Sequence, residues 1–167
     1  IRREGRPSDE AILSGRIVDR TIRPLFDHRL RREVQVVTTI LSIDEETDPD
    51  FIALVTASTA LAISPIPWDG PVAGVKVMTR KGAPEVIVNP KNSEVAADFE
   101  LVAFAAGTAD RINMIELEGK EAPEEAAVAA MAKAKEEITR LVAWQREIVA
   151  KIGEKKAVVP LIDSPPE

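Results

Sequence analysis

The spacing of apolar residues along this chain predicts three helices, with strand-like segments between them. The first helix is expected to begin after Ser8, whose hydroxyl suits an N-cap, and to end at Pro24. The nearly continuous apolar run over residues 51–63 predicts a buried second helix. Between residues 123 and 153, a leading proline, apolar positions at intervals of three and four, and a closing glycine indicate a long third helix. Its apolar stripe, interpreted as core packing, comprises Val128, Met131, Ile138, Leu141, Val142, Gln145, Ile148, Val149 and Ile152.

Strands are predicted by five segments rich in apolar and β-prone residues: 33–43, 72–78, 85–88, 99–105 and 112–117. The long apolar run of the first of these segments suggests burial on both faces. Together the elements predict an α/β (α+β) domain, with a mixed sheet packed against helices, over residues 1–153. Three prolines within residues 154–167 indicate a linker toward a following domain.

Composition and charge narrow the possible functions. Hydrophobic residues make up 45% and charged residues 30% of the chain, which is typical of a water-soluble globular domain. The net charge of −6 argues against a general nucleic-acid binder, yet the start of the chain is basic and contains arginine without lysine. These arginines are Arg2, Arg3, Arg6, Arg16, Arg20, Arg23, Arg29, Arg31 and Arg32. A basic end on an acidic chain indicates local contact with phosphate groups.

Several kinds of site are excluded by composition. The chain has no cysteine, which rules out disulfides and thiolate metal sites, and its only histidine, His28, argues against a multi-histidine metal site or a histidine relay. No apolar run approaches the roughly 20 residues that span a bilayer, and no signal peptide is visible. We therefore expect a cytoplasmic protein without membrane contact.

The arginine-rich start is the most informative motif. Arg2, Arg3 and Arg6 lie within five positions, next to a glycine and a proline that shape a turn. Arginine presents a planar fork of donors that suits phosphate oxygens, so this loop predicts contact with a polyanion. A solvated, arginine-rich terminus is the alternative.

The residues from Arg2 to Phe26 resemble the first RNase PH-like core of the polynucleotide phosphorylase family. In that family an arginine-rich loop is followed by Gly-Arg-Pro and by a helix that ends in Asp-Arg-x-Ile-Arg-Pro-Leu-Phe, which corresponds here to residues 19–26. Later segments fit in the same order along the chain: 47–50, 58–67, 68–71, 88–90 and 106–108. The resemblance weakens after Gly153 and implies an RNase PH-like (ribosomal protein S5 domain 2-like) fold. Because the family's first core begins with strands upstream of the arginine loop, we expect this chain to be a partial first core.

The resemblance implies a protein that uses phosphate to cleave RNA from its 3′ end and releases nucleoside diphosphates. In bacterial members three subunits form a ring around a pore, the second core carries the chemistry, and the first core grips single-stranded RNA. The implied Mg²⁺ and inorganic phosphate therefore belong to the other core of a homotrimer that acts in mRNA degradation. Arg2 and Arg3 would contact RNA phosphates, and Arg6 would contact RNA backbone or a vestigial anion site. Ile1 takes the nearer of two positions that are aromatic in the family, so base stacking is not carried over.

Two features argue against catalysis in this chain. Active RNase PH-like cores offer a Ser- or Thr-rich turn to phosphate before the buried helix, where this chain has Asp48-Pro49-Asp50-Phe51. Two carboxylates would repel phosphate, and the proline removes a backbone donor. Active cores also carry paired aspartates near a lysine that hold magnesium, whereas Asp98 and Glu100, expected on one side of a strand, are followed by no nearby lysine. We predict no catalytic residue and no metal site in this chain. Asp98 and Glu100 are weak candidates for metal binding and are expected to lie at a solvated strand edge instead.

Three further arginines, Arg16, Arg20 and Arg23, are spaced to share one face of the first helix. They are interpreted as anion contacts or as structural residues, with Arg20 expected to pair with an acidic residue, because a buried arginine left unpaired would be strongly destabilising. Trp68 and Trp144 could stack on bases but are interpreted as packing residues.

Two alternatives remain open. One is a structural domain that assembles the trimer without affinity for RNA, so that replacing Arg2 and Arg3 would leave RNA binding unchanged. The other is an active RNase PH-like phosphorolytic enzyme with a differently built phosphate site and a metal at Asp98 and Glu100. The salt dependence of RNA binding distinguishes a phosphate-gripping loop, whose binding weakens as salt rises, from the first alternative.

Overall fold

The computed structural model describes residues 5, 8–83 and 85–163, and its centre is an antiparallel sheet. Within these residues, four strands lie in the order β2-β1-β3-β4. The strands are β1 (Ala73–Thr79), β2 (Ile87–Val88), β3 (Leu101–Gly107) and β4 (Ile112–Gly119). We expected a mixed sheet, but every pair of neighbouring strands is antiparallel. Short connections join β1 to β2 and β3 to β4, which suits antiparallel neighbours, and the segment with the one short helix carries the chain from β2 past β1 to β3.

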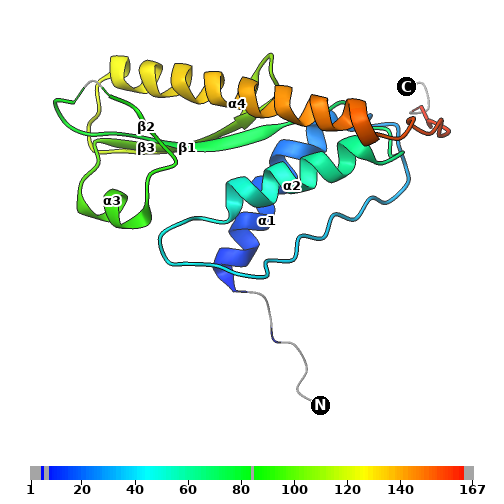
Figure 1. Ribbon diagram of the computed structural model, residues 1–167, viewed down its shortest axis with the longest axis horizontal. Coiled ribbons are helices and arrows are strands. Elements are labelled where there is room, and N and C mark those ends of the chain that lie inside the picture. The colour runs from blue at the N-terminus through cyan, green and yellow to red at the C-terminus, as the bar shows by residue number, and fades with distance from the viewer. Residues whose placement is uncertain (1–4, 6–7, 84, 164–167) are drawn as a thin grey trace.

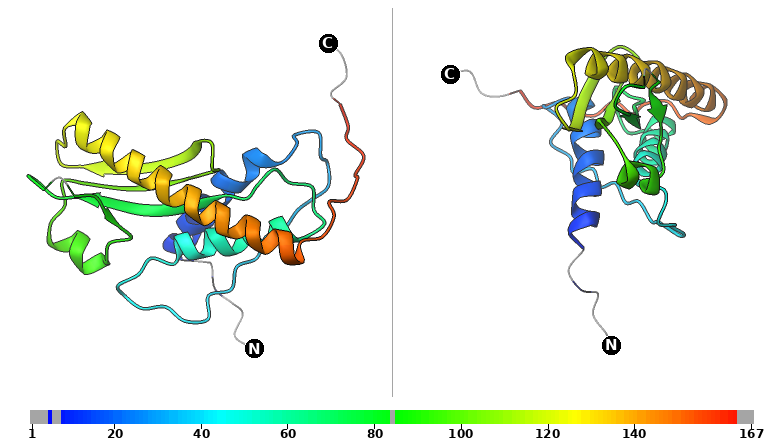
Figure 2. Two further views of the ribbon diagram at one scale, coloured as in Figure 1. Left: turned by 45° about the horizontal axis from the view of Figure 1, so that its top comes forward. Right: turned by 90° about the vertical axis from the view of Figure 1, so that its left-hand side faces the viewer.

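Helices cover both faces of the sheet (Figure 1). They are α1 (Asp9–Ile22), α2 (Asp50–Ile63), α3 (Asn92–Ala97) and α4 (Glu124–Ile152), with a 3₁₀ turn, η1 (Arg23–Leu25), after α1. α4 runs along one face of the sheet, whereas α1 and α2 pack from the other side (Figure 2). The α/β class, with a sheet packed against helices, and all three predicted helices are confirmed.

Alternate residues of the central strands build two hydrophobic cores, one on each face of the sheet. Val75, Val77, Ala103 and Ala105 point toward α4 and meet the buried face of that helix. On the opposite face, buried residues of α1 and α2 pack against Met114 and other residues of the sheet. The two central strands therefore serve both cores at once.

The buried face of α4 differs from the predicted stripe. Ala130 and Ala134 lie against the sheet beside Ile138, and all three are 0% exposed. Val128 and Ile152, which the spacing places in the stripe, are 69% and 64% exposed. Alanine lets the helix backbone approach the sheet closely, which a count of large apolar residues does not anticipate.

A buried polar cluster joins α2, α4 and the start of β1. The side-chain carbonyl of Gln145 accepts from the hydroxyl of Ser58 at 2.7 Å, and its amide nitrogen donates to Val72 O at 2.8 Å. The Thr59 hydroxyl lies 3.1 Å from the same carbonyl, but its closer acceptor is Val55 O at 2.7 Å. The backbone N–H of Val72 in turn donates to Ser58 Oγ at 2.9 Å. Because Ser58 and Gln145 are 0% exposed, each polar group depends on the others for its hydrogen bonds.

The segment 33–43, predicted as a strand, is unpaired within the described residues. It has no strand assignment and makes no backbone hydrogen bond to any of those residues. Val37 is 74% exposed and Leu41 is 92% exposed, so the expected burial on both faces is also wrong. A strand requires a neighbouring ladder as well as β-prone residues, and local preference cannot supply that neighbour.

The described residues after Gly153 lie against the body of the domain without forming a helix or a strand. Lys156 Nζ donates to the carbonyls of Leu61, Ala62 and Ser64 at 2.8, 3.0 and 2.7 Å, which places a positive charge at the C-terminal end of α2. Burial lowers the pKa of this lysine. Residues 154–163 are therefore held against the rest of the domain by contacts such as those of Lys156.

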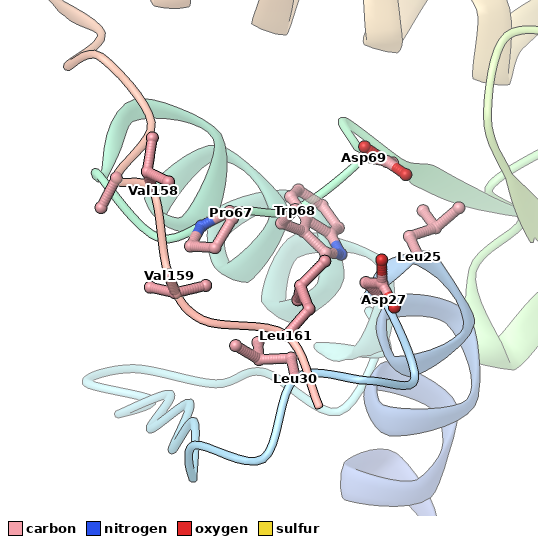
Figure 3. Close-up of a pocket in the computed structure, with 10 residues that line it drawn as sticks. Leu25, Asp27, Leu30, Pro67, Trp68, Asp69, Val158, Val159 and Leu161 are labelled. Carbon is pink, nitrogen blue, oxygen red and sulfur yellow. The ribbon is translucent and has the colours of Figure 1, made fainter. Parts of the chain in front are cut away.

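Farther along this segment, apolar side chains line a cavity of about 290 Å³ over Trp68 (Figure 3). Val159 and Leu161 line it from this segment, and Leu30 lies beside Leu161. Trp68 is 7% exposed and its Nε1 donates to Ile22 O at 3.0 Å, which agrees with a packing role. By contrast, Trp144 is 50% exposed and contributes little to the core.

Candidate nucleic-acid interface

The outer face of α1 carries two exposed arginines. Ser8 caps this helix as predicted, accepting a hydrogen bond from Ala11 N at 3.2 Å. Ile17 and Ile22 are buried against α2 and the sheet, which turns Arg16 and Arg20 outward into solvent. Among the described residues, neither arginine forms an ion pair.

Arg23, rather than Arg20, is the arginine of this group that pairs with an acid. Its Nε and Nη2 atoms donate to Asp19 Oδ1 at 2.9 and 2.7 Å, four positions apart along the chain. Arg20, which was expected to pair with an acidic residue, forms no ion pair among the described residues, because the positions three and four away from it (Arg16, Ile17, Arg23 and Pro24) include no acid. Arg23 is 77% exposed, so the pair contributes at most about 1 kcal/mol.

Arg2, Arg3 and Arg6 lie outside the described residues, and their role as RNA contacts stays a prediction. They precede α1 directly in the sequence, and that helix begins at Asp9. The exposed Arg16 and Arg20 therefore continue, along the chain, the basic character of the loop.

At the start of α2, a carboxylate is bound by a lysine and an amide from distant elements. Asp48 Oδ2 accepts from Lys76 Nζ at 2.6 Å, and Asp48 Oδ1 accepts from Asn92 Nδ2 at 3.0 Å. Burial acts to raise the pKa of Asp48, but the hydrogen bonds from Lys76 and Asn92 and the lysine charge outweigh it, so this pKa lies below its usual range. Asp48 is therefore ionised at neutral pH and holds the lysine.

Asp48 and Lys76 border a cavity of about 410 Å³ between α2, α3 and the sheet. Asp50, Glu116 and Glu118 add three more carboxyl groups to its lining. The Oδ1 atom of Asp50 is buried and has no hydrogen-bond partner among the described residues. Negative charge thus dominates the cavity, and its one lysine already binds a carboxylate of the protein itself.

Sequence reasoning missed the pairing of Lys76. The family pattern places a lysine shortly after the acidic pair that corresponds to Asp98 and Glu100. Lys76 instead lies on β1 and forms an ion pair with Asp48 at the start of α2. The signal was present in the sequence, because Lys76 is the one charged residue in the otherwise apolar strand 73–79. A lone charge in a buried strand indicates a partner on a packed neighbour.

Asp98 and Glu100 do not form the predicted strand edge. Asp98 is the exposed C-cap residue of α3, and Glu100 precedes β3, which begins at Leu101. The short helix α3 was not predicted, because its six residues are too few for a helical period to show. Within the described part of the chain, no group of three or more His, Asp or Glu side chains is arranged to hold a metal ion.

Replacing Asp48 with asparagine is expected to flatten the loss of stability in acid. Since its pKa is lower in the folded than in the unfolded protein, ionised Asp48 contributes its full stabilisation above about pH 4, and this is lost as the pH falls through the folded-state pKa. The contribution is about 1 kcal/mol or less, because the carboxyl is 41% exposed.

Urea unfolding at pH 7 and pH 3 measures this contribution. The free energy of unfolding should drop less between the two pH values for Asp48→Asn than for the parent protein. Asp69→Asn, at an exposed carboxylate, is the control that should behave like the parent. An equal drop in the parent and in Asp48→Asn would contradict the role given to the Lys76 pair.

Comparison with known proteins agrees with this fold. The model of the 3′ exoribonuclease family, domain 1 (RNase PH), matches residues 1–67. The chain is 45% identical over 164 residues to a polyribonucleotide nucleotidyltransferase of Anoxybacillus flavithermus, covering 98% of this chain and 23% of that protein. A protein of the same name from Geobacillus kaustophilus is 45% identical over 167 residues, covering 99% and 22% respectively. The crystal structure of rice Rrp46 superposes with a TM-score of 0.64 at 12% identity, over 87% of this chain and 68% of that one.

The antiparallel sheet with its helices and these matches define an RNase PH-like member of the 3′ exoribonuclease family. Within that family the chain belongs with the polyribonucleotide nucleotidyltransferases, and it corresponds to their first RNase PH-like core. The resemblance seen in the sequence is thereby confirmed. The chain spans about 23% of the length of the relative from Anoxybacillus flavithermus. None of the helices in the described part combines the length and apolar character needed to cross a bilayer.

Proposed function

We propose that this chain is an RNA-gripping, non-catalytic core of a phosphate-dependent 3′-to-5′ exoribonuclease. One observation carries the proposal: Arg16 and Arg20 stand exposed on α1, without an ion-pair partner among the described residues, directly after the Arg2–Arg3–Arg6 loop. On a chain with a net charge of −6, such a local concentration of arginine favours contact with a polyanion. Guanidinium groups suit the phosphates of single-stranded RNA.

The non-catalytic part of the proposal is supported by the start of α2. A phosphate ion needs free donors, yet Lys76 and Asn92 already donate to Asp48. Asp50 places a second carboxylate in the same cavity. The protein's own carboxylates therefore occupy the hydrogen-bond donors in this region and would repel a phosphate ion.

The parent protein is proposed to carry its chemistry in another core. That core would bind Mg²⁺ and inorganic phosphate. Three copies of the parent protein would assemble around RNA in the cytoplasm, where they would act in mRNA degradation. The names of the relatives support the polyribonucleotide nucleotidyltransferase activity in this proposal, and its other parts rest on the resemblance of residues 2–26 to the family.

Removing arginines in pairs should weaken RNA binding and its dependence on salt. Each phosphate contact on single-stranded nucleic acid contributes about 0.7 to the slope of log affinity against log salt, so Arg2→Ala/Arg3→Ala should reduce that slope by about 1.4. Arg16→Ala/Arg20→Ala should have the same effect if both side chains contact phosphates. Fluorescence anisotropy with a labelled single-stranded RNA, titrated at several salt concentrations, measures both slopes.

The control is Arg146→Ala/Lys151→Ala, which removes two exposed positive charges from α4 and should leave the slope unchanged. Diphosphate release is followed in the same samples with added phosphate and Mg²⁺. RNA binding that is unchanged in both double-arginine variants would favour the structural assembly domain. Phosphate-dependent release of diphosphates by this chain would favour the active-enzyme alternative and overturn the non-catalytic assignment.

A further inference from the structure

The helix α1, which carries Arg16 and Arg20, is buried only near its C-terminal end within the described residues. Its buried residues, Ile17, Thr21 and Ile22, all lie in the last two turns. The first half of the helix is exposed or half-buried and extends away from the sheet (Figure 1 and Figure 2). Contacts at the C-terminal end therefore set the direction in which α1 extends.

Two side chains from other elements hold this end by hydrogen bonds to its carbonyls. Asn113 Nδ2 donates to Thr21 O at 3.1 Å, and Trp68 Nε1 donates to Ile22 O at 3.0 Å. Both carbonyls belong to the last turn of α1, where the regular partners of the helix interior are missing. Apolar packing has no preferred direction, whereas a hydrogen bond does, so these two bonds restrict how α1 can tilt on the sheet.

A bulge in β4 aims Asn113 at α1. Ala106 pairs with Met114 and Gly107 pairs with Ile112, so Asn113 is an extra residue that faces no partner on β3 in this register. Residues two apart share a face in a regular strand, yet Ile112 packs with the core under α4 and Met114 with the core under α1 and α2. The strand thus changes face at Asn113, which brings the amide of this residue to the α1 side.

We propose that Asn113 is a positioning residue for RNA binding, which acts by setting the direction of α1 and hence the places of Arg16 and Arg20. This inference rests on the proposed function, because it requires that the two arginines contact phosphates. Asn113 itself reaches the carbonyl of Thr21 and acts on RNA only through the helix.

The length of α1 turns a small tilt into a displacement that matters for binding. The helix begins at Asp9, about 18 Å along its axis from Thr21 at about 1.5 Å per residue. A tilt of about 10° at Thr21 would move Arg16 by about 1 Å and the start of the helix by about 3 Å. Hydrogen bonds between guanidinium and phosphate groups vary in length by only a few tenths of an ångström, so either displacement would weaken them.

Asn113→Leu tests this inference in the whole chain, because it nearly keeps the shape of the side chain, removes its donor and leaves the charge unchanged. Anisotropy with a labelled single-stranded RNA should show an affinity lower by about threefold or more, the equivalent of one hydrogen bond. The control Thr139→Val removes an exposed side-chain bond to Lys135 O on α4 and should leave the affinity unchanged. Circular dichroism and urea unfolding establish that both variants are fully folded in the assay.

The same substitution in the Arg16→Ala/Arg20→Ala background separates positioning from a general structural effect. If Asn113 acts through the arginines, Asn113→Leu should no longer change RNA affinity once they are removed. An undiminished loss in that background, or no loss in the otherwise unsubstituted chain, would overturn the inference and leave the proposed function standing, provided that the arginine pair alone weakens binding. RNA binding that removal of the arginine pair does not alter would refute the proposed role of α1, and this inference with it.

Discussion

Gln145→Ala is expected to lower the free energy of unfolding by about 3 kcal/mol or more. The change leaves the carbonyl of Val72 without its donor and the Ser58 hydroxyl without its acceptor, in a site where Gln145 itself is 0% exposed. Each buried polar group left unpaired costs about 1–3 kcal/mol. The lost side chain also leaves a void between α2, α4 and β1.

Urea unfolding at neutral pH measures this effect, and Arg146→Ala at the next, exposed position provides the control, with an expected change within about 0.5 kcal/mol. A double-mutant cycle with Ser58→Ala isolates the shared hydrogen bond, because residues in one network give coupling energies of about 0.5–3 kcal/mol. Strict additivity of the two changes would mean that the cluster does not act as a unit.

Gly107→Ala is expected to destabilise the protein by about 3 kcal/mol. A Cβ atom at this position would collide with the carbonyl oxygen of Arg111 and would lie 2.8 Å from the Cα atom of Ile112. Both are backbone atoms of the turn that leads into β4, at the point where the β3–β4 register shifts. Because no side chain can rotate away to relieve the contact, the turn itself must move.

The matched control for this substitution is Gly15→Ala in the exposed face of α1, where an added Cβ meets nothing within 4 Å. Since glycine is unfavourable inside a helix, that change should stabilise the protein by up to about 1 kcal/mol. Thermal unfolding followed by circular dichroism compares the two directly. A similar, small effect of both substitutions would refute the close backbone approach at Gly107.

The elements that could be predicted from the sequence are those whose pattern is complete within one segment. The N-cap at Ser8, the apolar run of α2 and the glycine after α4 each mark an element locally, and each prediction is confirmed. The turn before β2 is similar, because Gly82 adopts a φ of 74°, a conformation that glycine readily takes.

What could not be predicted depends on contacts between distant segments. The segment 33–43 has the composition of a strand, but only a neighbouring ladder could make it one. Lys76 and Asp48 are 28 positions apart, and Gln145 meets Ser58 across 87 positions. The sequence identifies such residues as polar groups in apolar surroundings, but only the fold identifies their partners.

The same limit applied to the arginines of α1. Their shared face could be predicted from their spacing, but the choice of Arg23 as the partner of Asp19 depends on the geometry of four-residue neighbours. Arg20, which was expected to pair with an acidic residue, is instead exposed beside Arg16. This reversal supports the RNA-gripping proposal, because no acidic residue in the described part of the chain pairs with that charge.

The division of the β1 and β3 side chains between two cores has a consequence for cooperativity. Val75 and Ala105 serve the core under α4, while neighbouring positions on the same strands, such as Ala106, serve the core under α1 and α2. Any displacement of either strand loosens both layers together, because close-packed interiors transmit strain rather than absorb it. We therefore expect the sheet and its two helical layers to unfold together as a single cooperative unit.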